Sequence, residues 1–180
     1  MHVLVAYASH FGSTAQIARR IGEVLGERGL QVTVAPLSCA PHTSLFDAYV
    51  VGSAIHGSHW LPEAMDFVRR ETALLSERPT WLFSSGPVGD TAVRAMSSHG
   101  SSALADLNEL NRLTSAVEHR TFAGAYDRAS SDFSGLGLLE RTVVRRFLPD
   151  GDWRDWPAIE GWAETIAARM ARVPQAASVA

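Results

Sequence analysis

The stretch "VLVAYASHFGSTAQIARRI", residues 3–21, joins a short apolar segment to an amphipathic one through a turn rich in hydroxyl groups. Residues 3–8 are apolar, with β-branched side chains at alternate positions, and predict a strand that is buried on both faces. Apolar residues then recur at helical spacing through Leu25, which predicts an amphipathic helix. A strand that leads directly into a helix is the repeating unit of an α/β protein.

The rest of the chain alternates in the same way. Further strands are expected at residues 30–37, 48–55, 80–86 and 120–126. Helices are expected at residues 62–75, 103–118, 136–148 and within 150–173, the last with an apolar stripe at Ile159, Trp162, Ala163, Ile166, Ala167 and Met170. This alternation predicts an α/β fold, with a mostly parallel sheet of five strands, right-handed crossovers and helices on both faces.

Composition limits the class of protein. The 180 residues suit one domain, expected at 1–172, followed by a flexible tail at 173–180. A hydrophobic fraction of 46% and a net charge of −3 argue against a disordered chain and against a nucleic-acid partner. Cys39 is the single cysteine, so no intrachain disulfide can form and a reducing cytoplasm is expected. No apolar run reaches the roughly 20 residues of a transmembrane helix.

The turn after the first strand predicts a phosphate site. In a parallel sheet, ligands bind beyond the carboxyl ends of the strands. Residues 9–14 (Ser9, His10, Phe11, Gly12, Ser13 and Thr14) lie there, at the start of a helix whose backbone N–H groups favour anions. Their hydroxyl groups can donate to phosphate oxygens, and Gly12 allows close approach of the backbone. The alternative is that Ser13 or Thr14 only caps the helix.

The same turn excludes two other kinds of phosphate loop. All 16 basic residues are arginine, so the chain cannot contain the GxxxxGK[ST] motif of nucleotide-hydrolysing proteins. The GxGxxG fingerprint of dinucleotide-binding proteins is missing as well, because Gly12 is the only glycine of this turn. The phosphate of a mononucleotide, held by neutral donors, remains.

Two more glycine-containing loops follow expected strands. Residues 52–63, "GSAIHGSHWLPE", place Trp60 where the chain leaves the sheet, either as a wall for a flat heteroaromatic ring or as a residue packed in the core. Residues 84–90, "SSGPVGD", could offer backbone polar groups to such a ring, or form an ordinary tight turn. The scattered histidines lack the Asp, Glu or Cys partners of a metal site.

The remaining segments carry weaker signals. Tyr126, Asp127 and Arg128 follow the fifth expected strand, and a solvated loop is favoured for them over contact with a substrate. Residues 151–157, "GDWRDWP", are interpreted as structural, with Trp153 and Trp156 anchoring the last helix. Nucleophilic catalysis is not favoured, because the chain has no GxSxG motif and Cys39 has no obvious base nearby.

These segments together resemble the flavodoxin family. The order of elements and "YASHFGSTAQIA" resemble its first strand and FMN-phosphate loop, which implies a three-layer sandwich with strand order 2-1-3-4-5. A narrower resemblance joins four segments to the subgroup that includes bacterial menaquinone-dependent protoporphyrinogen dehydrogenase: "YASHFGST…IA", "VVGSAIHGSHWLPEAMDFV", "FAGAYD" and "GDWRDWPAIEGWAETIA". In that subgroup a long insertion precedes the last strand, and residues 91–119 take its place here.

The resemblance implies FMN as the cofactor and assigns residues to it. Residues 9–14 would hold the phosphate, and two later loops would flank the isoalloxazine ring. The implied ring contacts are Ser53, Ala54, Ile55, His56, Gly57 and Trp60 on one side, and Ser85, Gly86, Pro87, Val88, Gly89 and Asp90 on the other.

The function that we expect from the sequence is that of an FMN-dependent redox enzyme. Its sharpest form is a protoporphyrinogen dehydrogenase that passes electrons to a quinone, so a quinone, a porphyrinogen and a redox partner protein are the candidate partners. Two alternatives stay open, an electron carrier and a flavodoxin-fold regulatory protein. A carrier commonly docks through a strongly acidic face, of which a net charge of −3 gives little sign. The basic residues of 91–119 are only Arg94 and Arg112, so peripheral membrane contact is not favoured.

Overall fold

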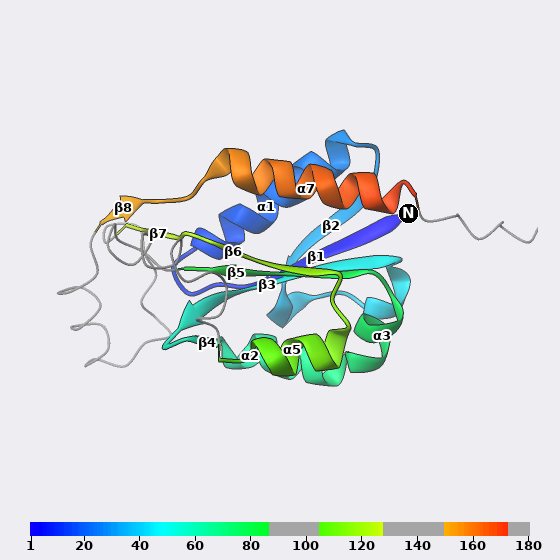
Figure 1. Cartoon of the computed structure of the whole chain (residues 1–180), viewed down its shortest axis with the longest axis horizontal. Coiled ribbons are helices and arrows are strands. Elements are labelled where there is room, and N and C mark those ends of the chain that lie inside the picture. The colour runs from blue at the N-terminus through cyan, green and yellow to red at the C-terminus, as the bar shows by residue number, and fades with distance from the viewer. Residues whose placement is uncertain (87–104, 128–149, 173–180) are drawn as a thin grey trace, which may run out of the picture.

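Five parallel strands form the central sheet of the computed structural model, which describes residues 1–86, 105–127 and 150–172 (Figure 1). Across the sheet they are β2 (Gln31–Pro36), β1 (His2–Ala8), β3 (Ala48–His56), β5 (Thr80–Ser85) and β6 (Glu118–Phe122). Every neighbouring pair is parallel, which requires a crossover between them. The predicted order 2-1-3-4-5 is confirmed for the strands of this sheet counted along the chain.

Three short strands were not predicted. β4 (His59–Trp60) folds back antiparallel on the end of β3, and β7 (Ala125–Tyr126) pairs with β8 (Gly151–Asp152) in a separate sheet. The predicted strand at 120–126 is therefore wrong at its carboxyl end. Its neighbour β5 ends at Ser85, opposite Phe122, so within the described residues the chain beyond Phe122 has no partner in the main sheet, and Ala125 and Tyr126 pair with β8 instead.

Helices cover both faces of the sheet, as predicted (Figure 1). α1 (Ser13–Glu27) and α7 (Trp156–Met170) lie on one face. α2 (Pro62–Arg70), α3 (Thr72–Glu77) and α5 (Leu107–Thr114) lie on the other, and the short turns η1 (Leu37–Cys39) and η2 (Thr43–Leu45) follow β2. The helix predicted at 62–75 is divided at Glu71, and α5 is shorter than the predicted 103–118. The helix predicted at 136–148 and the tail at 173–180 lie outside the described residues.

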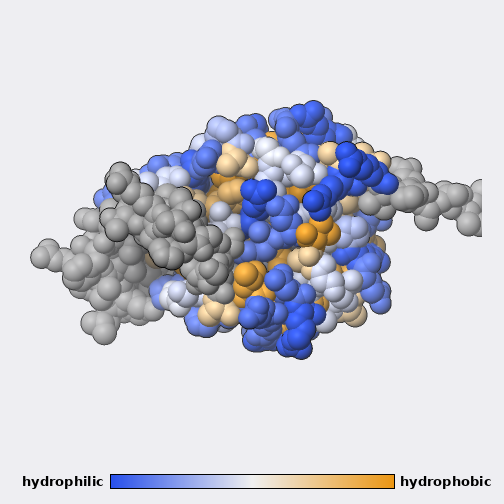
Figure 2. All heavy atoms as spheres, viewed as in Figure 1, coloured by the Kyte–Doolittle hydropathy of each residue, from blue (hydrophilic) through white to orange (hydrophobic). Residues whose placement is uncertain are grey.

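The core has two halves, one on each face of the sheet. All six stripe residues predicted for the last helix are buried in α7, and so are the apolar positions predicted in α1. Between these helices and the sheet, Phe83 and Trp162 pack ring against ring at 6.3 Å. Hydrophilic residues cover the rims where the helices lie, and hydrophobic residues show between them (Figure 2).

One close approach in the sheet predicts a large effect of a single methyl group. A Cβ added to Gly52 would lie 2.0 Å from the ring of Phe83, its partner on β5. We expect Gly52→Ala to lower the free energy of unfolding by about 1–3 kcal/mol through overpacking. Gly26→Ala in α1 is the matched control, because its added Cβ meets open space and should stabilise the helix by about 1 kcal/mol. Urea unfolding measures both, and equal effects would refute the packing argument.

Candidate cofactor site

The carboxyl ends of the parallel strands meet at the left edge of the sheet in Figure 1. The turn after β1, the β3–β4 hairpin and the segment after β6 all lie at this edge. A ligand in an open α/β sheet binds in the crevice outside these ends. The structure thus brings to one edge the predicted site residues that it describes.

The turn after β1 is built around Gly12. Its φ of 83° is in the left-handed region, where a side chain is strained, and Gly12 is the N-cap of α1. Among the described residues no side chain caps this helix, and no acidic residue lies in its first turn, so no carboxylate of the first turn competes for its N-terminal N–H groups. The alternative that Ser13 or Thr14 serves only as a cap is therefore wrong.

Two serines of the turn accept bonds from the backbone. Ser9 Oγ accepts from the N–H of Gly12 at 3.1 Å, and Ser13 Oγ accepts from the N–H of Ala125 at 2.9 Å. A hydroxyl that accepts in this way keeps its own hydrogen for another acceptor. Ser13 Oγ also lies 3.5 Å from Ser85 Oγ, so residues predicted from the first and the third loop lie next to each other.

Thr14 carries the strongest test of fit to a phosphate. Its residue is 1% exposed, and its Oγ1 is buried with no hydrogen-bond partner among the described residues. A buried hydroxyl without a partner costs about 1–3 kcal/mol. Neutral hydroxyl donors beside free helix N–H groups are the donor set that a phosphate monoester accepts. The turn therefore fits the phosphate group of FMN.

The β3–β4 hairpin is held from two sides. Gly57 and Ser58 have φ of 57° and 68°, the conformation of a two-residue hairpin turn. The Asp106 carboxylate accepts from the backbone N–H of Trp60 at 2.8 Å and bonds His59 Nδ1 at 2.9 Å. The N–H of Ala105 donates to Ser58 O. These contacts fix the position of Ala54, Ile55, His56 and Gly57 at the edge of the sheet.

Two predicted ring contacts lie inside the protein. Ser53 is fully buried, and its hydroxyl donates to Ala54 O and accepts from the N–H of Leu61. Trp60 is 3% exposed and its Nε1 donates to Ser84 Oγ at 2.7 Å. This placement favours the core-packing alternative for Trp60, and its contact with a flavin stays a prediction.

The Trp60 indole is connected through Ser84 to His119, a histidine that the sequence did not predict at this site. Ser84 Oγ, which accepts from Trp60, also forms a hydrogen bond with His119 Nε2, 2.8 Å away on β6. The other ring nitrogen, Nδ1, is buried without a partner among the described residues. Burial lowers the pKa of His119 from 6.5 to about 4, so the imidazole is neutral at pH 7.

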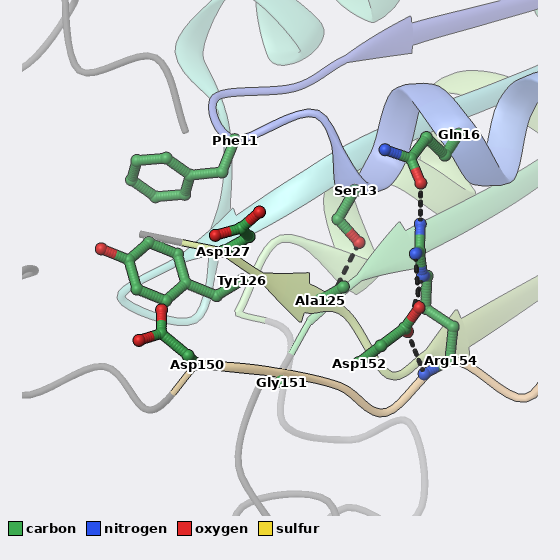
Figure 3. A pocket seen from close by; sticks show the side chains of 10 residues that line it. All are labelled: Phe11, Ser13, Gln16, Ala125, Tyr126, Asp127, Asp150, Gly151, Asp152 and Arg154. Carbon is green, nitrogen blue, oxygen red and sulfur yellow. Dashed lines mark hydrogen bonds and ion pairs between the residues drawn. The ribbon is translucent and has the colours of Figure 1, made fainter. Parts of the chain in front are cut away.

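A pocket of about 480 Å³, which the sequence did not predict, lies beside the turn after β1 (Figure 3). The ring of Phe11 meets that of Tyr126 edge to face at 5.5 Å. The residues that line it are Phe11, Ser13, Gln16, Ala125, Tyr126, Asp127, Asp150, Gly151, Asp152 and Arg154. Tyr126 is 2% exposed, so the prediction that it lies in a solvated loop is wrong. The available signal was its place at the end of the strand predicted at residues 120–126, beyond the carboxyl end of the sheet.

The other predicted site residues are placed as follows. His10 is half-buried with its ring 6.2 Å from that of Phe11, and Gly86 is half-buried after β5 with a φ of 123°. Pro87, Val88, Gly89 and Asp90 lie outside the described residues.

The described residues contain neither a membrane-spanning helix nor a cluster of metal-binding side chains. Within residues 1–86, 105–127 and 150–172, no helix combines the length and the apolarity that a membrane crossing requires. The same ranges hold no group of three or more His, Cys, Asp or Glu side chains arranged to bind a metal ion.

Residues 4–148 match the family model described as "Flavodoxin domain". The chain belongs to the flavodoxin-domain family. FMN is the cofactor that this assignment indicates, in agreement with the fit of residues 9–14 to a phosphate. No curated protein sequence matches the chain at a significant level.

Solved structures confirm the fold of this flavodoxin-domain chain. A flavodoxin from the domain Archaea is 16% identical, with a TM-score of 0.62 over 95% of this chain and 99% of the other. A flavodoxin of Streptococcus pneumonia TIGR4 is 19% identical, with a TM-score of 0.61 over 94% and 99%. Rubredoxin oxygen:oxidoreductase of Desulfovibrio gigas is 15% identical, with a TM-score of 0.55 over 94% of this chain and 36% of that protein.

Proposed function

We propose that the chain is an FMN-dependent oxidoreductase whose cofactor phosphate is held by the turn from Ser9 to Thr14. The observation that carries this proposal is the hydroxyl of Thr14, which is buried at the start of α1 and, among the residues that the structure describes, has no hydrogen-bond partner and no capping side chain beside it. The ends of β3 and β5, at Ala54–Gly57 and Ser85–Gly86, are the proposed contacts of the isoalloxazine ring. When bound, FMN supplies electron transfer in one- or two-electron steps.

The chain's own residues hold the cofactor by neutral groups. The first N–H groups of α1 and the hydroxyls of Ser9, Ser13 and Thr14 donate to the phosphate, and the helix dipole balances part of its charge. Gly12 lets the backbone turn toward the anion. The β3–β4 hairpin, anchored through Asp106, supplies backbone polar groups beside the ring.

As the finer function we propose a protoporphyrinogen dehydrogenase that passes electrons to a quinone. Support comes from the four sequence segments that resemble this subgroup. One of them, residues 151–167, forms β8 and most of α7, and so belongs to the wall of the pocket beside the phosphate turn. A small-molecule pocket at the cofactor edge suits an enzyme better than a protein whose only task is to carry electrons.

FMN titration of the purified protein tests the cofactor. We expect the protein to be yellow, or to quench the fluorescence of added FMN at a 1:1 ratio, with riboflavin binding more weakly because it lacks the phosphate. Equal affinity for FMN and riboflavin would move the phosphate away from residues 9–14, and failure to bind either flavin would refute the proposal.

Steady-state assays separate the enzyme from a carrier. With protoporphyrinogen and a menaquinone analogue, the FMN-loaded protein should oxidise one and reduce the other over many turnovers. Electron exchange with a reductase protein but no turnover of either small molecule would support a carrier instead.

A further inference from the structure

The antiparallel strands β7 and β8, called the β7–β8 pair below, lie against the first turns of α1 (Figure 3). The backbone N–H of Ala125 in β7 donates to Ser13 Oγ at 2.9 Å. Arg154, just after β8, donates from Nη1 to Gln16 Oε1 at 2.6 Å. Segments that are more than 100 residues apart along the chain are thus joined at the start of the helix that the proposed phosphate site uses.

Arg154 is the centre of this attachment. Its side chain is only 8% exposed. It forms a bidentate ion pair with Asp152, in which Nε donates to Oδ1 at 2.8 Å and Nη2 donates to Oδ2 at 2.5 Å. Its guanidinium plane lies 4.5 Å from the ring of Trp156 at the start of α7. One planar group therefore ties β8, α7 and α1 together, as the fork geometry of arginine allows and that of lysine does not.

The attachment determines what the Ser13 hydroxyl can do. A serine hydroxyl has one hydrogen to donate, and Ser13 Oγ already accepts from Ala125. Its hydrogen is available to Ser85 Oγ, 3.5 Å away, or to a ligand oxygen at the turn. If β7 moved away, Ser13 Oγ would lose the Ala125 N–H and be free to change rotamer, which would turn its hydroxyl away from an anion at the turn.

We infer that Arg154 is a positioning residue for the turn from Ser9 to Thr14. It holds the β7–β8 pair on α1, so that the N–H of Ala125 keeps the Ser13 hydroxyl oriented as a donor to the cofactor phosphate. This inference rests on the proposed binding of FMN. Because Asp152 balances the guanidinium charge, Arg154 acts through Ser13 and not by attracting the phosphate directly.

The test compares the affinities of FMN and riboflavin, whose ratio isolates the contribution of the phosphate. In Arg154→Gln we expect the preference for FMN to fall by about tenfold, since a hydrogen bond to a charged group is lost or weakened, while riboflavin affinity stays unchanged. Arg154→Lys, which keeps the charge, should lose most of the preference as well. If Arg154→Lys kept the wild-type preference for FMN over riboflavin, the positive charge itself would attract the phosphate, and the inference would be overturned.

Two further variants separate positioning from general destabilisation. Arg20→Gln is the matched control, because Arg20 also joins α1 to α7, through Glu160 at 2.8 Å, but lies away from the turn. It should leave the preference for FMN unchanged. In a Ser13→Ala background, Arg154→Gln should have no further effect on the preference, and a full additive effect there would overturn the inference.

Hydrogen exchange of the apoprotein tests the attachment without a cofactor. The amide of Ala125 should exchange faster in Arg154→Gln, and also in Gln16→Ala, which removes only the acceptor on the exposed side of α1. Unchanged exchange in both would overturn the inference, even if no flavin bound. Failure of the wild-type protein to bind either flavin would instead refute the proposed function. The exchange rate of the Ala125 amide would still show whether Arg154 holds the β7–β8 pair on α1.

Discussion

Thr14→Val should weaken FMN binding by roughly ten- to hundredfold and leave the apoprotein at least as stable as wild type. A hydrogen bond from this hydroxyl to a charged phosphate is worth about 1.5–3 kcal/mol, which gives the loss in affinity. The same hydroxyl is buried without a partner among the described residues, so a methyl group in its place removes an unsatisfied group from the apoprotein. Binding and stability should therefore change in opposite directions.

Fluorescence titration with FMN and urea unfolding of the apoprotein measure the two effects. Thr114→Val is the matched control, because Thr114 is also fully buried but its Oγ1 donates to Leu110 O at 2.8 Å. That variant should lose about 1 kcal/mol of stability and keep its affinity for FMN. If Thr14→Val destabilised the apoprotein as Thr114→Val does and bound FMN normally, the Thr14 hydroxyl would be structural and the phosphate would lie elsewhere.

Acidification should destabilise the protein through His119. The pKa of this imidazole is about 4 in the folded protein and near 6.5 in the unfolded chain. Between these values the unfolded chain binds a proton that the folded protein excludes, so stability falls as the pH is lowered from 7 toward 4. The full shift corresponds to about 3 kcal/mol, which is a large part of the stability of a domain of this size.

Comparison of wild type with His119→Gln isolates this contribution from that of the carboxylates. The free energy of unfolding is measured in urea at several pH values, and the difference between the two proteins should change by about 3 kcal/mol from pH 7 to pH 4. Glutamine keeps an acceptor for the Ser84 hydroxyl. A constant difference between His119→Gln and wild type would contradict the buried, neutral imidazole.

Local patterns in the sequence were sufficient for the alternation of strands and helices and for the buried faces of the helices, whereas the order of the strands was implied by the family resemblance. The apolar residues of α1 and α7 recur at a helical period, and each such stripe has one face that must be buried. The Gly12 turn was recognised for the same reason, because a glycine between a strand and a helix is a local signal. These features depend on residues a few positions apart, so they can be predicted without knowledge of the packing.

Neither the end of β6 nor the pairing of β7 with β8 could be predicted from local patterns. "RTFAGAY" has the composition of one strand, yet its second half pairs with β8 because β5 is too short to accompany it. Likewise Trp60 follows a strand like a ligand contact, but Ser84 binds its indole in the core. Whether a residue meets a ligand or a neighbour depends on which distant strand lies beside it.

By itself, the sequence determined an α/β chain with a glycine-containing turn of neutral hydroxyl donors after the first strand, because periodicity and turn composition act over short distances along the chain. Only the tertiary structure decided that Ala125 bonds Ser13, that Arg154 reaches Gln16 and that Asp106 holds the β3–β4 hairpin. Each of these contacts joins residues at least 46 positions apart. Their geometry follows from how the layers pack, which no local pattern encodes.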